Sequence, residues 1–522
     1  MGICDLLGFI FVSYCARQRN IEKKPYEKFD IDFQWSFVNF TWPSPMDYHY
    51  AVTNSKYIPE NNAMSGIKYY NNRMYVALPR LRPGTPVTLA FIPLNSKTKT
   101  NPLLRPFPSW DMNVQKNCST LQNVHSMEID RYGVMWVIDG VRTNGFTKCP
   151  PKIVLLDLKN AGKVLHTYVV PNDVTLHQGG LLNDIVIDES DGGFAYITDN
   201  SMQDPGLVVY SRSYNKSWKF RDSSMYPEVE AADFTVDGVV SETMTPISGI
   251  AMGPIPMRRK DNRMVYYSAL TSYSLYSLGT HVLKDKELCR SGEWRREVEY
   301  VGQKRSQSNG LVTDSKGNLY YGLLSRYGVG RWNVKKPFET ARNVDINKRT
   351  IIWPDSFAFD NAGHLYLLAN GMNKYLSRNY QLKLSTDIKF RILKMFTGTN
   401  SYLYMIDKYI MNSCLGGCFA IKNQKSSLLV RGQSYLPCQS SSCTLCRNRV
   451  VVYEAWTDPD LSKRSKHSSN SSNYSCYTNC GSNRLDDFED YGNYWIDDDC
   501  ESSIGQCSEM VSDGYQIDAE NY

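Results

Sequence analysis

Residues 308–322, SNGLVTDSKGNLYYG, contain the pattern that decides the fold. A short polar start leads into an alternating strand, a turn follows, and a second strand is rich in aromatic residues. Alternation with period two on either side of a turn whose Asp, Asn and Gly tolerate positive φ predicts a β-hairpin. The pattern occurs six times, at residues 64–77, 125–139, 183–199, 247–252 with 264–268, 308–322, and 354–368.

The spacing of these six copies predicts how the hairpins assemble. They begin roughly every 45 to 65 residues, which leaves room for two further strands in each copy. Four strands make a propeller blade, and radial closure of the blades leaves few exposed strand edges. We therefore expect an all-β, six-bladed β-propeller over residues 17–409, in preference to separate sandwich hairpins or a doubly wound α/β fold. Residues 1–45 are expected to lie across the outside or to complete the last blade.

The aspartates that precede the hairpin turns have a simpler interpretation than catalysis. An Asp at the start of a turn accepts hydrogen bonds from the backbone of the turn. We expect this of Asp130, Asp188, Asp314 and Asp360.

The N-terminal residues 1–16 predict a signal peptide, and hence a secreted, extracellular protein. An apolar core at residues 6–12 is followed by the small residues Ser13, Cys15 and Ala16. A buried β-strand is the alternative, since no basic residue precedes the apolar core. Glycosylation sequons support export; they begin at Asn39, Asn117, Asn215, Asn470 and Asn473.

Residues 410–522 differ from the rest of the chain. They contain nine of the fourteen cysteines, a Ser-rich run at 462–475 and an acidic end. This composition predicts a flexible linker and a disordered tail. The pair Cys443 and Cys446 has zinc-ligand spacing, but no second matching pair follows, and disulfides are the simpler expectation in an exported chain.

The charge distribution bears on possible partners. The net charge is +6, and because residues 485–522 hold twelve acidic and no basic residues, residues 1–484 carry about +18. The Lys and Arg residues are scattered and no nucleic-acid-binding motif appears, so we expect no nucleic-acid partner. The N-terminal apolar core is too short to span a bilayer, so we expect no membrane insertion.

A set of short segments, taken in order, gives this chain a family resemblance. The segments are 72–80 with 84–90, 135–140, 194–199 with 206–210 and 215–220, 307–310, 321–326 with 331–333, and 353–360. They resemble the insect yellow and major royal jelly protein family from about residue 33 to 380. The resemblance implies secreted β-propeller proteins with roles in cuticle pigmentation and the melanin pathway, some of which capture small aromatic amines.

The resemblance also bears on the cysteines. The family usually has Cys-Trp where this chain has Arg331-Trp332, so Cys289 is expected to be free or paired elsewhere. Cys118 and Cys149 remain at their positions on either side of one hairpin. The resemblance implies that these two cysteines form a disulfide.

The shared register of the hairpins predicts a ring of residues at the mouth of the central channel. If the first strand of each hairpin is innermost, the residue that begins it stands at the same height in every blade. These residues are Ser65, His125, Asn183, Ser248, Asn309 and Asp355. All are small or polar, whereas closed-core positions would be mostly apolar. The ring could bind a polar ligand or a calcium ion; alternatively, it caps the strands and binds channel water.

The resemblance leaves three functions open. The first, implied by the resemblance, is binding of a small aromatic amine or catechol derivative, for which the ring would supply Asp355 as counter-ion and Phe357 would supply cation–π attraction. The second, also implied by the resemblance, is a dopachrome-converting isomerase, in which His125 would act as general base and Asn183 or Asn309 would steady an oxyanion. The third is a structural cuticle or eggshell matrix protein, cross-linked through Tyr and the Cys-rich tail. Hydrolase signatures and phosphate-binding loops are missing, and apart from the possible calcium ion we expect no cofactor or metal. The oligomeric state stays open.

Overall fold

The computed structural model describes residues 28–140, 148–241, 243–256, 262–377 and 379–404. These residues all belong to one compact unit. The predicted signal peptide at 1–16, the tail at 410–522, its cysteines, and the sequons at Asn470 and Asn473 lie outside the described residues. Within the described ranges, no helix is long and apolar enough to cross a membrane.

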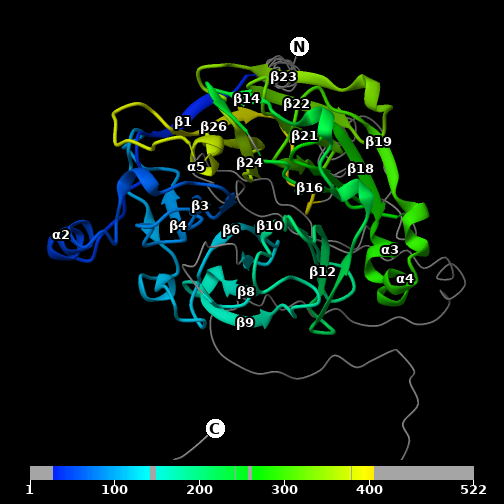
Figure 1. The fold of residues 1–522 in the computed structure, drawn as a ribbon, viewed down its shortest axis with the longest axis horizontal. Helices are drawn as coiled ribbons and strands as arrows, with labels where there is room; N and C mark the ends of the chain where they lie inside the picture. Colours follow the sequence, from blue (N-terminus) through cyan, green and yellow to red (C-terminus); the bar gives the residue numbers. More distant parts are fainter. Residues whose placement is uncertain (1–27, 141–147, 242, 257–261, 378, 405–522) are drawn as a thin grey trace, which may run out of the picture. The chain divides into compact units, whose positions relative to one another are not determined.

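Six antiparallel sheets of four strands form the blades of a propeller, as expected from the six copies (Figure 1). The first three are β2 (Ile67–Tyr70), β3 (Arg73–Ala77), β4 (Leu89–Pro93) and β5 (Arg105–Pro106); β6 (Val124–Ile129), β7 (Val134–Asp139), β8 (Lys152–Asp157) and β9 (Lys163–Val169); β10 (Leu182–Asp188), β11 (Phe194–Asp199), β12 (Gly206–Ser211) and β13 (Lys216–Phe220). The others are β16 (Ile247–Met252), β17 (Met264–Ala269), β18 (Ser274–Gly279) and β19 (Glu299–Gln303); β20 (Leu311–Thr313), β21 (Asn318–Leu323), β22 (Gly328–Asn333) and β23 (Arg342–Ile346); β24 (Pro354–Phe359), β25 (His364–Ala369), β26 (Phe390–Phe396) and β1 (Asp30–Trp35).

Two features close the ring of blades. The innermost strands β2, β6, β10, β16, β20 and β24 each contact the next, and β24 contacts β2. In the last blade, β1 pairs antiparallel with β26, from Asp30 opposite Lys394 to Trp35 opposite Phe390. An N-terminal strand therefore completes the last blade, which is one of the two arrangements expected for residues 1–45.

Short elements outside the blades build the loops. The hairpin β14 (Thr235–Val236) and β15 (Val239–Val240) precedes the fourth blade. The described α-helices are α2 (Pro45–Thr53), α3 (Thr280–Lys284), α4 (Lys286–Ser291) and α5 (Met372–Leu376). Of these, α5 connects β25 to β26 and matters for the site described below.

The hairpin turns confirm the expected role of the aspartates. Asp314 Oδ1 accepts from the backbone N–H groups of Lys316 and Asn318, at 2.9 and 2.8 Å. The same two bonds, to residues two and four positions on, form at Asp130 and Asp360. Asp188 accepts from Ser190 N at 3.2 Å. These carboxylates are thus used to shape turns.

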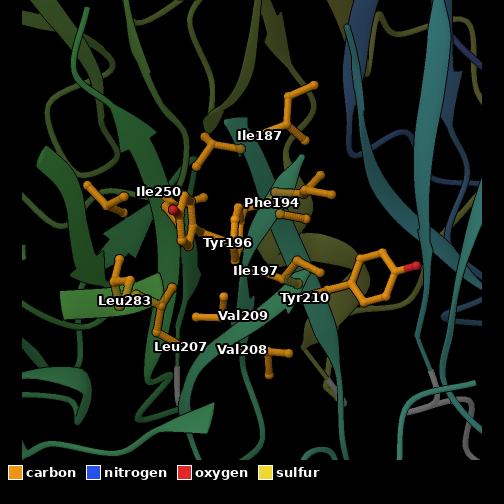
Figure 2. Close-up of a cluster of buried hydrophobic side chains, with 14 of the residues drawn as sticks. Ile187, Phe194, Tyr196, Ile197, Leu207, Val208, Val209, Tyr210, Ile250 and Leu283 are labelled. Carbon is orange, nitrogen blue, oxygen red and sulfur yellow. The ribbon is translucent and has the colours of Figure 1, made fainter. Parts of the chain in front are cut away.

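The core lies between neighbouring blades, because each blade packs its faces against the next. Every residue of β11 and β12 is buried, so these strands carry apolar side chains on both faces. Figure 2 shows Tyr196 of β11 and Val208 of β12 in one cluster with Ile250 of the fourth blade. Burial on both faces explains why the hairpins contain so many consecutive apolar residues.

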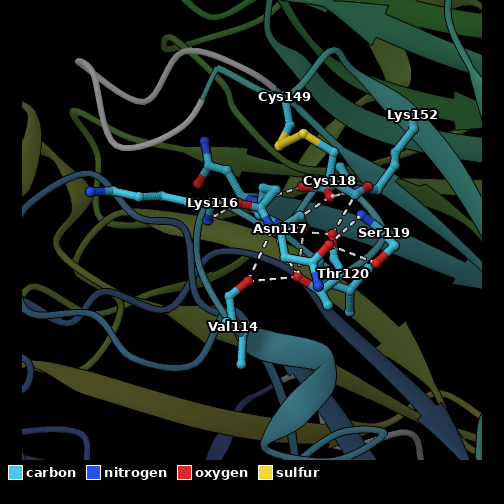
Figure 3. Close-up of a disulfide and its surroundings, with 12 residues drawn as sticks. Val114, Lys116, Asn117, Cys118, Ser119, Thr120, Cys149 and Lys152 are labelled. Carbon is cyan, nitrogen blue, oxygen red and sulfur yellow. Dashed lines mark hydrogen bonds and ion pairs between the residues drawn. A yellow bond between two sulfur atoms is a disulfide. The ribbon is translucent and has the colours of Figure 1, made fainter. Parts of the chain in front are cut away.

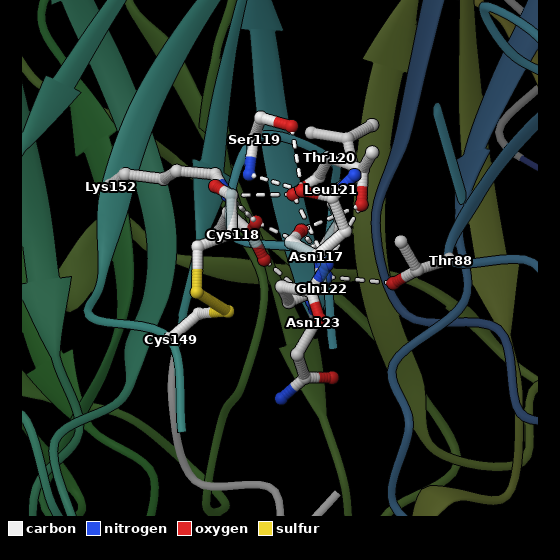
Figure 4. Close-up of polar contacts among 12 residues, drawn as sticks. Thr88, Asn117, Cys118, Ser119, Thr120, Leu121, Gln122, Asn123, Cys149 and Lys152 are labelled. Atoms are coloured by element: carbon white, nitrogen blue, oxygen red, sulfur yellow. Dashed lines mark hydrogen bonds and ion pairs between the residues drawn. A yellow bond between two sulfur atoms is a disulfide. The ribbon is translucent and has the colours of Figure 1, made fainter. Parts of the chain in front are cut away.

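Cys118 and Cys149 form the predicted disulfide, with Cα atoms 5.2 Å apart (Figure 3). Beside it, Lys152 Nζ donates to the carbonyl oxygens of Cys118 and Thr120, both at 2.6 Å. Figure 4 shows the loop that follows, in which Gln122 Nε2 donates to Asn117 O at 2.7 Å. The disulfide thus anchors the loop that leads directly into β6.

Cys289 forms no disulfide with any described residue. Its thiol lies half-buried within α4, with Sγ 3.3 Å from the carbonyl oxygen of Lys219. Burial raises the pKa of this thiol to about 11. The thiol is therefore protonated at neutral pH, and in this form it is a poor nucleophile.

Candidate functional site

One end of the central channel widens into a cavity of about 570 Å³, which we call the upper cavity. All six residues of the predicted ring line it: Ser65, His125, Asn183, Ser248, Asn309 and Asp355. Loops from several blades complete the wall with Arg82, Trp353 and Tyr375. The structure therefore brings the ring together at a concave site, and binding by these residues stays a prediction.

Irregular strand pairing turns four of the ring residues toward the cavity. His125, Asn183, Ser248 and Asp355 each stand where the register of the inner strand shifts against the second strand of its blade. Such a β-bulge adds one unpaired residue and re-aims its side chain. The same irregularity in four blades explains why one sequence position reaches the channel repeatedly.

Hydrogen bonds link the ring from blade to blade. Asn183 Nδ2 donates to Ser248 Oγ at 3.2 Å, and Ser248 Oγ donates to Asn309 Oδ1 at 2.8 Å. Asn309 Nδ2 then donates to one carboxyl oxygen of Asp355, and Asn370 Nδ2 donates to the other. Some polar groups of the ring thus form hydrogen bonds that join neighbouring blades, in agreement with the strand-capping interpretation.

Glycines allow the inner strands to approach closely just below the ring. A Cβ added at Gly310 would overlap the carbonyl oxygen of Asp355, and one at Gly249 would overlap that of Asn309. No side chain fits at either position without moving the neighbouring backbone. These two glycines set the spacing at which the ring side chains meet.

Burial controls the charge of the cavity. Loss of solvent raises the pKa of Asp355 to about 8, although hydrogen bonds from Asn370 and Asn309 oppose the rise. Burial also raises the pKa of Asp184, one position below the ring, to about 6, against the effects of Lys68 and Ser126. Asp355 is therefore mostly protonated at pH 7 in the free protein. A cationic ligand would favour its ionised form.

Phe357 does not lie where the amine-binding hypothesis needs it. It lines a second cavity of about 400 Å³ at the opposite end of the channel, which we call the lower cavity. The aromatic side chains on the wall of the upper cavity are Trp353 and Tyr375. Trp353 is held at φ 55°, a strained conformation for a bulky residue, and stacks on Phe234 with ring centroids 5.9 Å apart.

The lower cavity contains a compact charged network. Lys68 Nζ lies 3.1 Å from Glu128 Oε2, and the Tyr402 hydroxyl donates to the same carboxylate oxygen at 3.1 Å. The Tyr402 oxygen also accepts from Ile187 N at 3.0 Å. Tyr402, which follows the last strand of the propeller, is fully buried, so it packs into this end of the channel.

The described residues hold no group of three or more His, Cys, Asp or Glu arranged for a metal ion. Asp355 is the one carboxylate of the ring, and both its oxygens already accept amide hydrogen bonds. A calcium ion needs six to eight oxygen ligands, so these bonds would have to break. Calcium in the channel stays a proposal with little support from the geometry.

The three described sequons differ in accessibility. Asn117 and Asn215 are exposed, and Asn215 stands in the turn between β12 and β13. Asn39 is half-buried, and its Oδ1 accepts from Trp42 Nε1 at 2.9 Å. Glycosylation at these sites stays a prediction.

The fold and the site together define a six-bladed β-propeller with a ligand-sized cavity at one end of its channel. The family model described as "Major royal jelly protein" matches residues 122–399, which is more than half of the sequence. The chain therefore belongs to the major royal jelly protein family.

Two curated relatives from Drosophila melanogaster align over most of the propeller. The chain is 26% identical to "Dopaminechrome tautomerase" over 74% of its own length and 85% of the relative. It is 25% identical to "Protein yellow" over 69% of its own length and 67% of the relative. Among solved structures, a luciferin-regenerating enzyme aligns with a TM-score of 0.39 at 11% identity, covering 65% of this chain and 93% of that one. This structural likeness is too weak to bear on function.

Proposed function

We propose that this protein is secreted and binds a small aromatic amine or catechol-derived pigment precursor in the upper cavity, within a cuticle pigmentation or melanin pathway. The names of the two relatives, "Dopaminechrome tautomerase" and "Protein yellow", support this chemistry. The Cys118–Cys149 disulfide supports export, since structural disulfides persist in oxidising compartments.

The observation that carries the proposal is the meeting of three kinds of group in one cavity. Its volume of about 570 Å³ is typical of small-molecule sites. Trp353 and Tyr375 line the wall as largely buried aromatic residues, the amides of Asn183 and Asn309 are polar, and Asp355 has a carboxyl group. A ligand ammonium group near Asp355 would favour the ionised form of its carboxyl group. Asp355 would therefore lose its proton and become the counter-ion when the ligand binds.

Titration calorimetry with dopamine and serotonin tests this proposal on the full chain. Asp355→Asn and His125→Ala should each weaken binding about tenfold or more, while thermal melts remain cooperative. Glu287→Gln is the matched control, because it removes a carboxylate from an exposed ion pair on α4. Unchanged affinity in both cavity variants would remove the ring as the site. No binding of either amine would leave a matrix role.

A specific observation favours a second function, tautomerisation of an aminochrome. This isomerisation needs one group to take a proton from carbon and another to deliver one to a quinone oxygen, without an oxidant. Asp355 has a pKa near neutrality and shares the cavity with His125 and Asp184. Decolourisation of dopaminechrome by the pure protein, lost in Asp355→Asn, would establish this activity. A rate equal to that of buffer alone would leave a binding protein.

A further inference from the structure

Arg82 lies on the wall of the upper cavity, and only part of its guanidinium group forms hydrogen bonds with the described residues. Its Nε donates to Tyr375 O at 3.3 Å, and its Nη2 donates to Tyr375 O and Ser377 O at 3.2 and 2.8 Å. Among the residues that the structure describes, no carboxylate lies within 4.0 Å of it and Nη1 has no hydrogen-bond acceptor. The side chain is half-buried, so a positive charge stands at the cavity without a counter-ion.

A nearby arginine shows what a structural guanidinium looks like in this fold. Arg80 is fully buried, and all three of its nitrogens donate to carbonyl oxygens of surrounding loops. Arg263 and Arg131, at other positions in the propeller, each pair with a carboxylate. Arg82 differs from all three, because it is anchored on one side only and keeps two N–H groups for another partner.

The chemistry of the available partner follows from these two N–H groups. A guanidinium recognises a carboxylate through charge-assisted hydrogen bonds, and carbonyl contacts that fix its plane reduce the entropy lost on binding. The same cavity holds the Asp355 carboxyl group and the rings of Trp353 and Tyr375. An aromatic α-amino acid carries the complementary set of groups: an ammonium, a ring and a carboxylate.

We propose that Arg82 binds the carboxylate of the ligand, so that the upper cavity prefers aromatic amino acids and their cyclised oxidation products over the corresponding decarboxylated amines. This inference rests on the proposed function and narrows its ligand class.

A pair of ligands that differ only in the carboxylate tests the inference. Calorimetry on the full chain should show L-DOPA binding about 10- to 100-fold more tightly than dopamine. Arg82→Gln should remove this preference by weakening L-DOPA binding more than dopamine binding, while loss of the contacts to Tyr375 O and Ser377 O affects both ligands alike. Arg212→Gln is the matched control, because it removes an exposed guanidinium that lies over Trp136, away from the cavity. It should keep the preference.

Arg82→Lys separates recognition of charge from anchoring of α5. Lysine keeps the positive charge but loses the planar group that contacts Tyr375 O and Ser377 O, so part of the preference should survive. A lysine variant no better than Arg82→Gln would overturn the assignment, as would equal affinity of the natural chain for L-DOPA and dopamine. In that last case the proposed function stands. Failure to bind either ligand removes the proposed function and this inference together.

Discussion

Asp355 illustrates how its surroundings change the chemistry of one residue. It stands at a bulge, two amide groups donate to its oxygens, and burial still raises its pKa to about 8. The sequence places Asp355 in the ring, but it gives no sign of the partner Asn370, which lies outside the repeated pattern. The identity of the residue was therefore predictable, and its protonation was not.

The raised pKa makes a prediction about pH. An amine pairs with ionised Asp355, so below pH 8 binding must release a proton, and affinity should rise with pH from 6 to 8 by up to about tenfold per unit. The other titratable groups of the described wall are His125, Asp184, Arg82 and Tyr375. Dopamine titrations across this range should show the slope in the natural chain and in Glu287→Gln. A similar slope in Asp355→Asn would assign it to another group.

Phe357 shows where reasoning from a regular strand fails. In an unbroken strand, Asp355 and Phe357 would point to the same face, because side chains alternate with period two. The bulge between Pro354 and Ser356 interrupts this alternation. Asp355 therefore faces the upper cavity while Phe357 joins the blade core and the wall of the lower cavity.

At the scale of elements, the inner strands depend on glycine. Gly310→Ala should lower the free energy of unfolding by about 2 kcal/mol or more, because the added Cβ would overlap the Asp355 carbonyl oxygen. Gly253→Ala is the control, since its added Cβ would meet its nearest neighbour, Met264 O, at 3.3 Å. Urea denaturation of the two variants measures the difference. Equal stability would mean that the inner strands are not so closely packed.

The loop before β6 depends on its disulfide. Closing a loop of 31 residues contributes about 3 to 4 kcal/mol by the loop-entropy estimate. Replacing Cys118 and Cys149 together by serine should remove stability of that order, and it should also weaken ligand binding, because the loop leads into His125. Cys289→Ser serves as the control, with little change expected. A double variant as stable as the natural chain would show that the hydrogen bonds of Lys152 hold the loop alone.

The loops explain which site residues the sequence did not reveal. The hairpins carry an alternating pattern that can be followed along the chain, so the six ring positions could be aligned before the structure was known. Arg82, Tyr375 and Trp353 come from connections between strands, where no period exists. The positive φ of Trp353 depends on packing against Phe234, which is 119 residues away in the chain. Contacts of this kind follow from closure of the fold and not from local sequence.

At the scale of the whole molecule, closure of the propeller brings the six ring residues together in one site, although each hairpin alone indicates its ring residue only weakly. Each inner strand contacts the next, and the pairing of β1 with β26 joins distant parts of the chain in one blade. The repeat predicted six blades, and the structure has six. The sequence left open which end of the channel holds the larger cavity. That depends on loops at one end and on the insertion of Tyr402 at the other.

A crystal structure of the full chain soaked with L-DOPA and, separately, with dopamine tests the central claim most directly. The account predicts that ligand occupies the upper cavity, with its ammonium within hydrogen-bond distance of Asp355 and its ring beside Trp353 or Tyr375. Ligand found in the lower cavity or on the outer surface, with the upper cavity holding only water, would contradict it.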